Sequence, residues 1–430
     1  MLVRPRAPDL EGRRHWIERL SSSIIDELAG EYGTPLYVIH SQTLRERYHE
    51  FVTEFEKRYS NSLVFYAYKA NYLPAVCEQL HRLGCGAEVA SGMELELAMA
   101  LNVNPQQIAF NGPLKTENDL FHALSSGVKY LNADSPEELR ELDVICRRRR
   151  TKASVGIRVN TDVDLDLHGF RSKFGIDIAR GHARECVKLA SRLSRLKLVG
   201  LHTHIGTQIM SPNHYSKALS QIIQFLEENG QFAHSLEYVD VGGGFPSNSI
   251  APLGLTEAVP PIGSFATKIA EEMKRLSEKC GHEIKLLLEP GRYLVTDSIT
   301  LLLRVVRVKE CKTETFVVLD GGTNLVPTVR NLGLHHDLVV PGTRRTERGL
   351  KTVVGPLCSE YDTFLRGEFP LVKEGDIVAV PCVGAYDIPL SPQFLFPRAG
   401  AVLLDDGKSK LVRNRETMSH VFSLDSIRAS

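Results

Sequence analysis

The stretch LVFYAYKANYLPAVCEQLHRLGCGAEVASGMELELAMALN, residues 63–102, decides the fold, because it holds two successive strand–helix units. The apolar run at 63–70 is typical of a strand that is covered on both faces. A helical pattern follows at 74–84 and ends at Gly84, a common C-terminal stop. A second strand at 86–90 and a second helix at 92–102 repeat the order. This alternation predicts parallel strands joined by helices.

The alternation continues along most of the chain. Eight strands with helical patterns between them are expected at residues 63–70, 86–90, 107–112, 129–134, 153–160, 198–206, 236–244 and 283–292. Eight such units predict a (β/α)8 TIM-like barrel, which we place at residues 42–293.

After Arg292 the pattern changes to strands with little helix between them. This change predicts a second, all-β domain at residues 294–430. The run TPLYVIH at 34–40 is also strand-like and precedes the barrel. We expect one or more strands from residues 1–41 to join the β domain.

Composition excludes several classes of protein. The chain has 430 residues and a formal net charge of +0, which gives no reason to expect binding to nucleic acid or to an anionic membrane. The start lacks an apolar signal region, and no run of about 18 apolar residues is present. The eight cysteines are widely spaced without a C-x-x-C pair, which predicts reduced thiols and no metal site. A cytoplasmic protein is expected.

The expected strand ends carry the residues that suggest chemistry, since barrel active sites form at that face. Gly242, Gly243 and Gly244, with Arg292 after the next strand, predict a phosphate site. Lys69, expected to be buried opposite it, suggests a Schiff base to pyridoxal 5'-phosphate. On this reading, a carboxylate such as Glu289 would keep the ring nitrogen protonated.

His204 could pack flat on the cofactor ring. Taken alone, it would more often be a hydrogen-bonded core histidine, so its interpretation depends on the other residues.

Seven motifs in order then carry a family resemblance: YAYKAN, EVASGMELELA, HTHIGTQI, VDVGGGFP, LEPGRYLV, GPLCSEYD and GAY. Over roughly residues 34–400 the chain resembles the fold-type III pyridoxal-phosphate-dependent decarboxylases, the ornithine, diaminopimelate and arginine decarboxylase family. The diaminopimelate decarboxylase branch is the most similar. The resemblance implies an alanine racemase-like fold, decarboxylation through a Schiff base and a quinonoid intermediate, and a homodimer with shared active sites.

The resemblance also assigns residues. It implies that Lys69, His204 and Cys358 are catalytic, with Cys358 reaching the partner subunit's site as the acid that protonates Cα. Cofactor contacts are implied for Lys69, Glu88, His204, Thr207, Gly242, Gly243, Gly244, Glu289, Gly291, Arg292 and Tyr386. Alanine racemase has an arginine at the position of Glu289, so the glutamate favours decarboxylation.

Three segments depart from the diaminopimelate decarboxylase pattern. Ser359 replaces the usual Glu after Cys358, the loop 324–337 lacks an Arg-Pro…Leu-Tyr segment, and residues 387–398 differ from the usual stretch after GAY. The cofactor half is therefore intact, whereas the part that grips the distal end of the substrate is altered. We expect Arg330, His335 and His336 to contact the substrate, although a solvated loop is equally compatible with these residues.

The sequence therefore favours a modified amino acid of siderophore or antibiotic biosynthesis as the substrate, either free or bound to a carrier protein. One alternative is a genuine meso-diaminopimelate decarboxylase of lysine biosynthesis. Another is a non-catalytic homologue or a pyridoxal-phosphate-binding regulator, which the presence of both Lys69 and Cys358 disfavours. A racemase is disfavoured by Glu289.

Overall fold

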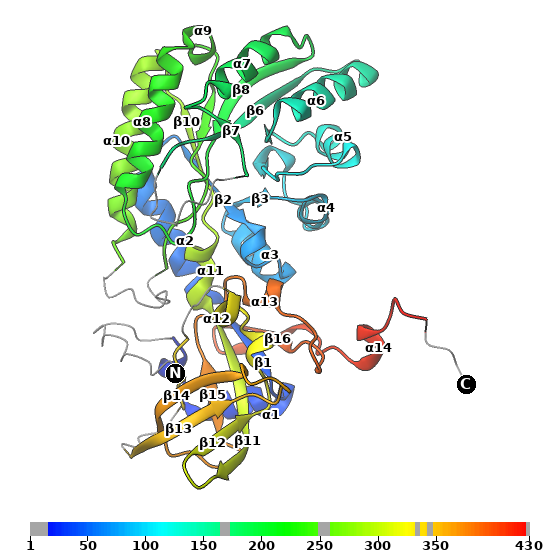
Figure 1. Ribbon diagram of the computed structural model, residues 1–430, viewed down its shortest axis with the longest axis vertical. Coiled ribbons are helices and arrows are strands. Elements are labelled where there is room, and N and C mark those ends of the chain that lie inside the picture. The colour runs from blue at the N-terminus through cyan, green and yellow to red at the C-terminus, as the bar shows by residue number, and fades with distance from the viewer. Residues whose placement is uncertain (1–15, 164–172, 248–258, 332–335, 342–346, 427–430) are drawn as a thin grey trace. The chain divides into compact units, whose positions relative to one another are not determined.

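The computed structural model describes residues 16–163, 173–247, 259–331, 336–341 and 347–426 (Figure 1). They divide into two compact units. The barrel unit comprises residues 46–246 and 259–293. The β unit comprises the described residues up to 45, residue 247, and those from 294 onward.

Eight parallel strands close the barrel, which confirms the predicted fold class. Around the barrel the order is β5-β4-β3-β2-β10-β9-β8-β6, and β6 pairs back to β5. The strands are β2 (Ser62–Ala67), β3 (Gly86–Val89), β4 (Ile108–Phe110), β5 (Tyr130–Ala133), β6 (Ala153–Asn160), β8 (Leu196–His202), β9 (Tyr238–Asp240) and β10 (Lys285–Leu288). A short strand, β7 (Ile176–Asp177), pairs with β6.

Helices surround these strands (Figure 1). They are α2 (Ser41–Glu56), α3 (Pro74–Arg82), α4 (Gly92–Ala100), α5 (Glu117–Ser126), α6 (Pro136–Arg149), α7 (His182–Arg192), α8 (Asn213–Glu227), α9 (Gly230–Ala233) and α10 (Ile262–Cys280), with 3-10 turns η2 (Tyr68–Ala70) and η3 (Pro105–Gln107). Side-chain caps begin α4, α5 and α6, where Ser91, Thr116 and Ser135 each accept a hydrogen bond from a backbone N–H of the first turn. Because these caps are local, the alternation of strands and helices can be recognised in the sequence.

Aromatic side chains fill part of the barrel interior. Tyr130 packs edge-on against Phe65, with ring centroids 5.3 Å apart, and against Tyr238 at 5.1 Å. Leu287 of β10 belongs to the same buried cluster. Burying each such side chain stabilises the fold by roughly 1.5–3 kcal/mol.

The β unit is built on one sheet with the order β14-β13-β12-β11-β1-β16-β17, and β15 also pairs with β11. Its strands are β1 (Leu36–His40), β11 (Ile299–Glu310), β12 (Thr315–Leu319), β13 (Arg348–Val354), β14 (Thr363–Pro370), β15 (Ile377–Val380), β16 (Gly400–Asp405) and β17 (Lys408–Arg413). The N-terminal strand β1 lies between β11 and β16, so a segment from before the barrel completes this sheet.

Short helices accompany the sheet. They are η1 (Trp16–Arg19), α1 (Ser22–Tyr32), α11 (Arg292–Val295), η4 (Thr296–Ser298), η5 (Thr323–Leu325), α12 (Thr328–Asn331), α13 (Asp387–Leu390) and α14 (Met418–Val421). The core joins α1 to the sheet through Ile25 and Leu28, which pack with Leu36, Leu302 and Val402.

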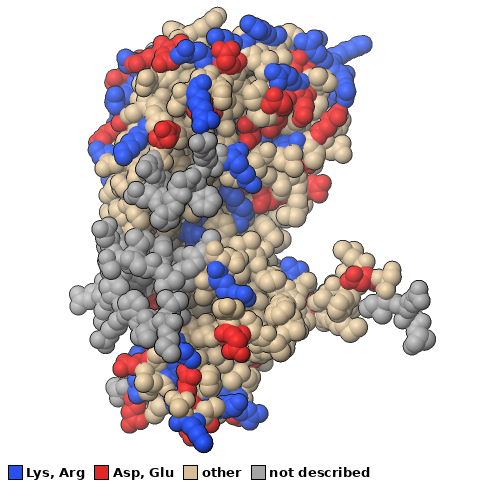
Figure 2. Space-filling view, in the orientation of Figure 1, with Lys and Arg blue, Asp and Glu red and all other residues tan. Residues whose placement is uncertain are grey.

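Surface features agree with the balanced composition. Positive and negative side chains are mixed over the face of the barrel unit that Figure 2 shows. No helix within the described residues has the length and apolarity needed to span a bilayer. All eight cysteines are free thiols, and only Cys311 and Cys358 are exposed.

Candidate active site

Lys69 lies just after the first barrel strand and pairs with Glu88. The strand β2 ends at Ala67, and Lys69 belongs to the following turn η2. Its Nζ donates a hydrogen bond to Glu88 Oε2 of β3, whose side chain is only 2% exposed. The Lys69 side chain is 40% exposed, so the expectation of a buried lysine is wrong. The amine is accessible while a buried carboxylate orients it.

The three glycines after β9 form a tight turn against the end of β10. Gly242 and Gly244 have φ values of 68° and 98°, which only glycine adopts readily. A side chain on Gly243 would overlap with the carbonyl oxygen of Glu289. Because the Tyr215 hydroxyl also donates to the Gly243 carbonyl at 2.7 Å, the turn is held in one place.

His204 contacts this turn as a neutral ring. Gly243 N–H donates to His204 Nδ1 at 3.1 Å, so Nδ1 is the acceptor and the ring proton is on Nε2. Burial, with the positive charges of Lys69 and Arg158, lowers the pKa of His204 to about 3. A neutral imidazole is suited to stack on an aromatic ring.

This shift predicts how His204 affects stability at low pH. Its folded pKa of about 3 lies below the ordinary 6.5, so between these values the unfolded chain binds the extra proton. The free energy of unfolding should therefore fall as pH is lowered through this window, by up to about 1.4 kcal/mol per pH unit for one group. In urea unfolding at pH 6.5, 5.5 and 4.5, His204→Gln should have a shallower acid dependence than wild type.

The control is His182→Gln, which changes an exposed histidine of α7 in the same unit. It should keep the wild-type slope. Parallel pH curves for wild type and His204→Gln would contradict the low pKa of His204.

Three buried groups, His202, Asp240 and Glu289, gather at the ends of β8, β9 and β10. Each offers one ligand atom, and these atoms lie within 4.8 Å of one another. Burial raises the pKa of Asp240 to about 6. Burial, together with Asp240 and Glu88, raises the pKa of Glu289 well above its ordinary value. Each of these carboxyl groups therefore favours its protonated form unless a cation lies beside it.

This cluster fits the ring nitrogen of pyridoxal phosphate. Asp240 Oδ2 and both ring nitrogens of His202 are buried and make no hydrogen bond within the described part of the chain. Burial lowers the pKa of His202 far enough to keep its ring neutral. A protonated ring nitrogen would add a positive charge beside Glu289, whose pKa burial and Asp240 raise. The spacing would also suit a metal ion, so the donor set alone does not decide between them.

The other predicted cofactor residues of the barrel unit lie near the same strand ends. Gly291 follows Glu289, and a side chain on it would overlap with Ala70 of η2. Arg292 is buried at the start of α11, whereas Thr207 is exposed in the loop after β8. The barrel thus brings Lys69 and Gly291 together from strands distant in the sequence.

The sequence did not indicate Arg158 of β6. Its guanidinium is 3.7 Å from Asp134 and 4.6 Å from the ring of Phe174, and the side chain is buried. Its charge interacts favourably with Glu289 and Glu88, so it offsets part of their negative charge. A cation within the apolar run 153–160 was the signal that could have identified it.

Tyr386 and Cys358, two further predicted residues, lie in the β unit. Tyr386 precedes α13 and has a φ of 71°, an uncommon value for a residue with a side chain and one that clusters at functional sites. Cys358 is exposed in the loop between β13 and β14. Asp362 holds this loop, because its carboxylate accepts from Leu357 N–H and Thr323 N–H, both at 2.7 Å.

The three predicted substrate contacts differ in their surroundings. Arg330 is exposed, 5.8 Å from the centre of the Tyr361 ring. His336 is buried within the β unit, where its Nε2 lies 3.1 Å from Thr328 Oγ1 and 3.6 Å from Asp387. This position indicates a structural role for His336 rather than a loop contact. His335 lies outside the described residues.

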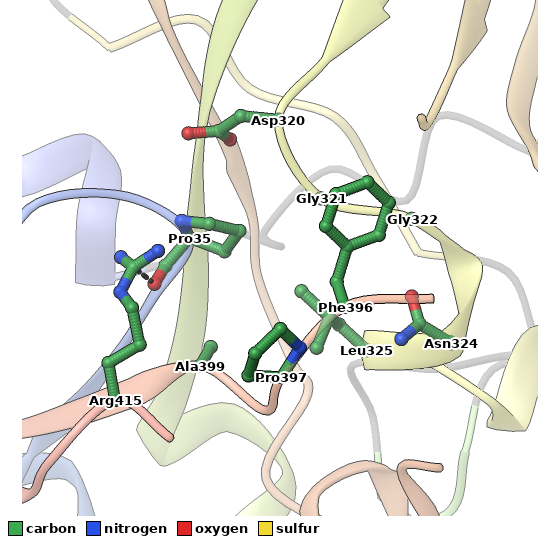
Figure 3. A pocket seen from close by; sticks show the side chains of 10 residues that line it. All are labelled: Pro35, Asp320, Gly321, Gly322, Asn324, Leu325, Phe396, Pro397, Ala399 and Arg415. Atoms are coloured by element: carbon green, nitrogen blue, oxygen red, sulfur yellow. Dashed lines mark hydrogen bonds between the residues drawn. The ribbon is translucent and has the colours of Figure 1, made fainter. Parts of the chain in front are cut away.

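Two of the segments that depart from the family pattern meet in the β unit. Asn324 Nδ2 donates to the Pro392 carbonyl at 3.2 Å. Beside them is a pocket of about 90 Å³, where Figure 3 shows the Phe396 ring near the Gly321–Gly322 turn. The pocket is lined by Pro35, Asp320, Gly321, Gly322, Asn324, Leu325, Phe396, Pro397, Ala399 and Arg415. Asn324 and Pro392 therefore bring the two altered segments into contact at one point.

Comparisons with known proteins agree with this geometry. The family model described as "Pyridoxal-dependent decarboxylase, pyridoxal binding domain" matches residues 41–296. The diaminopimelate decarboxylase of Aquifex aeolicus is 33% identical over 407 residues, which cover 92% of this chain and 93% of that protein. The Methanocaldococcus jannaschii enzyme of the same name is 30% identical over 412 residues, covering 93% and 92%.

Solved structures give the same result. The crystal structure of the M. jannaschii diaminopimelate decarboxylase in complex with L-lysine matches with a TM-score of 0.86 at 30% identity, covering 94% of both chains. A Selenomonas ruminantium lysine decarboxylase in complex with PLP and cadaverine matches with a TM-score of 0.77 at 25% identity, covering 90% and 95%. The comparisons decide for a cofactor over a metal ion: the chain belongs to the pyridoxal-dependent decarboxylase family, as an enzyme of the diaminopimelate decarboxylase type whose cofactor is pyridoxal 5'-phosphate.

Proposed function

We propose that this enzyme decarboxylates meso-diaminopimelate to lysine. The observation that carries the proposal is the match over nearly the full length to enzymes named diaminopimelate decarboxylase. The M. jannaschii complex with L-lysine supports lysine as the product. The modified substrate that the sequence favoured takes second place, since the comparisons name no enzyme of secondary metabolism among the relatives given above.

Four groups of the barrel unit would hold the cofactor. Lys69 Nζ supplies the amine for covalent attachment, and Glu88 orients it. The glycine turn 242–244 and Arg292 bind the phosphate, and the family resemblance assigns Tyr386 to the phosphate as well. Glu289 takes the ring nitrogen as its partner. The neutral ring of His204 stacks on the cofactor, because a charged ring would meet the positive charges of Lys69 and Arg158.

The cofactor, when bound, withdraws the electron pair left at Cα as carbon dioxide departs. The protein must then deliver one proton to Cα. We assign this proton to the thiol of Cys358, contributed by the partner subunit of a homodimer. Its exposure supports this role, because a thiol buried in its own chain could not reach another subunit. Asp362 would keep the Cys358 loop in place.

A different amino acid, modified at its distal end, is the second candidate substrate. The contact between Asn324 and Pro392 favours it, because that contact joins two segments in which this chain departs from the family pattern. Arg330, exposed near Tyr361, is the cation available there for an acidic distal group.

A substrate panel tests the proposal. Among meso-diaminopimelate, ornithine, arginine, lysine, citryl-diaminopropionate and carrier-bound glutamyl, meso-diaminopimelate should have the highest kcat/KM. A charge-paired distal contact is worth roughly 2–5 kcal/mol, so the margin over ornithine should be at least about thirty-fold. Carbon dioxide release gives the rate, and mass spectrometry identifies the product. If a citryl or carrier-bound substrate is turned over more efficiently, the second candidate replaces the first.

A further inference from the structure

A line of buried side chains crosses the barrel interior and ends on Glu289. The Tyr238 hydroxyl donates to Asn132 Oδ1 at 2.7 Å. Asn132 Nδ2 donates to Asn111 Oδ1 at 2.6 Å, and Asn111 Nδ2 donates to Glu289 Oε1. All four side chains are nearly inaccessible to solvent. We call Tyr238, Asn132 and Asn111 the amide relay.

The relay has a direction. A side-chain amide has a donor end and an acceptor end, so fixing one end fixes the other. Burial, with the charge of Asp240, raises the pKa of Tyr238 well above its ordinary value, so the hydroxyl stays protonated and donates. Asn132 must then accept from Tyr238 and donate onward, and Asn111 does the same. The last donor in the line is an N–H that points at Glu289.

Two glycines make room for the relay. Gly156 of β6 and Gly200 of β8 face each other in register, and Gly200 also faces Tyr238. A side chain on Gly156 would overlap with Asn132 Oδ1 and the Tyr238 hydroxyl, and one on Gly200 would overlap with the Tyr238 ring. The register between β6 and β8 shifts just before this pair, and a glycine is common at such an irregularity. The overlaps show in addition that side chains at these two positions would fill the space that the relay occupies.

Burial and the carboxylates of Asp240 and Glu88 oppose the ionisation of Glu289, whereas Lys69 and Arg158 favour it. The charged or titratable groups that act on it are Asp240, Glu88, Lys69, Arg158 and His202. Even with Asn111 in place, the net effect of burial and these groups is a raised pKa of Glu289. The N–H of Asn111 acts in the other direction, because a donor stabilises the charged form of a carboxylate. The second oxygen, Oε2, lies 3.7 Å from His202 Nε2, which is too far for a hydrogen bond.

We propose that the amide relay is a positioning device that holds Glu289 by Oε1, favours its ionised form beside the ring nitrogen of pyridoxal phosphate, and leaves Oε2 for that nitrogen. The proposal rests on the partnership of Glu289 with that nitrogen under the proposed function. A protonated ring nitrogen requires an ionised Glu289. Without the Asn111 donor, the carboxyl group holds its proton more strongly and the ion pair with the ring nitrogen is weaker.

Equilibrium binding of two ligands to the apo-enzyme tests the relay without measuring activity. One ligand is pyridoxal phosphate, and the other is its deaza analogue, in which a C–H replaces the ring nitrogen. Asn111→Leu should raise the Kd for pyridoxal phosphate by about 10- to 100-fold, the value of a hydrogen bond to a charged group. It should leave the Kd for the analogue nearly unchanged, because that ligand has no ring nitrogen to form an ion pair with Glu289.

Tyr238→Phe removes only the hydroxyl at the far end of the relay. It should raise the Kd for pyridoxal phosphate by about 2- to 10-fold, again without a matching change for the analogue. Its matched control is Tyr130→Phe, which changes the neighbouring ring, at a centroid distance of 5.1 Å, whose hydroxyl takes no part in the relay. This control should bind both ligands as wild type does.

The variant Glu289→Gln distinguishes a failure of the relay proposal from a failure of the pairing between Glu289 and the ring nitrogen. If Glu289→Gln weakens pyridoxal phosphate but not the analogue, Glu289 is the partner of the ring nitrogen. Equal weakening of both ligands by Asn111→Leu and by Tyr238→Phe would then overturn the relay alone. If Glu289→Gln does not discriminate between the ligands, the assignment of Glu289 fails and the relay fails with it.

Discussion

Replacing Lys69 with arginine should lower kcat by roughly 10³-fold or more and remove the yellow colour of the cofactor-loaded enzyme. Arginine keeps a positive charge beside Glu88, which is 2% exposed and would otherwise be left as a buried carboxylate without its partner. Its guanidinium stays protonated in proteins and so cannot form the covalent bond to the cofactor. The variant therefore removes the reactive amine but keeps the ion pair with Glu88.

The measurement is the absorption spectrum after reconstitution, together with carbon dioxide release. Lys285→Arg is the matched control, since Lys285 is a half-buried lysine of the same barrel whose Nζ donates to Asn61 Oδ1 at 2.9 Å. It lies at the first residue of β10, away from the strand ends that carry the site. A Lys69→Arg enzyme that keeps both colour and rate would contradict the role of Lys69.

The barrel could be predicted because each strand–helix unit carries its own signal. Apolar strands, capping residues such as Ser91 and Thr116, and stop glycines are all local features. The strand ends were less certain. The sequence predicted a strand to residue 70, but β2 ends at Ala67, and Lys69 lies in a turn with a partly exposed side chain. Both the aromatic run and the turn are apolar, so periodicity could not separate them.

The cofactor site was predictable to the extent that its residues follow strands. Once eight parallel strands were expected, the residues after each strand had to meet at one end of the barrel. Residues within the interior gave no comparable signal. Asn111, Asn132 and Tyr238 lie within the strands predicted at 107–112, 129–134 and 236–244, and no local pattern linked the three side chains. Their shared hydrogen bonds depend on the closure of the barrel.

The residues that contact the distal end of the substrate could not be predicted from the sequence. The residues HHD at 335–337 fitted a substrate contact and a solvated loop equally well, whereas His336 is buried against Thr328 and Asp387. Its partner Asp387 is 51 positions away in the chain, so no local pattern could reveal it. A departure from a family motif shows that contacts have changed but does not identify the ligand. The choice of a siderophore or antibiotic precursor went beyond that limit.

Replacing Cys358 with alanine should lower kcat by about 10²- to 10⁴-fold, the usual contribution of a positioned general acid, with little change in cofactor binding. The natural control is Cys311→Ala, because Cys311 is the other exposed thiol and lies in the same unit. It should leave kcat unchanged. If Cys311→Ala and Cys358→Ala behave alike, the thiol of Cys358 does not deliver the proton.

Mixing two inactive variants tests whether the sites are shared between subunits. In a homodimer with shared sites, a heterodimer of Lys69→Arg and Cys358→Ala contains one site in which both residues are intact. Equal amounts exchanged at random give heterodimers as half of all dimers, so about one quarter of the wild-type activity should return. Native mass spectrometry would confirm the exchange. If verified heterodimers remain inactive, Cys358 acts on the Lys69 of its own chain or takes no part, because only a thiol that crosses the interface can complement a lysine lost from the other subunit.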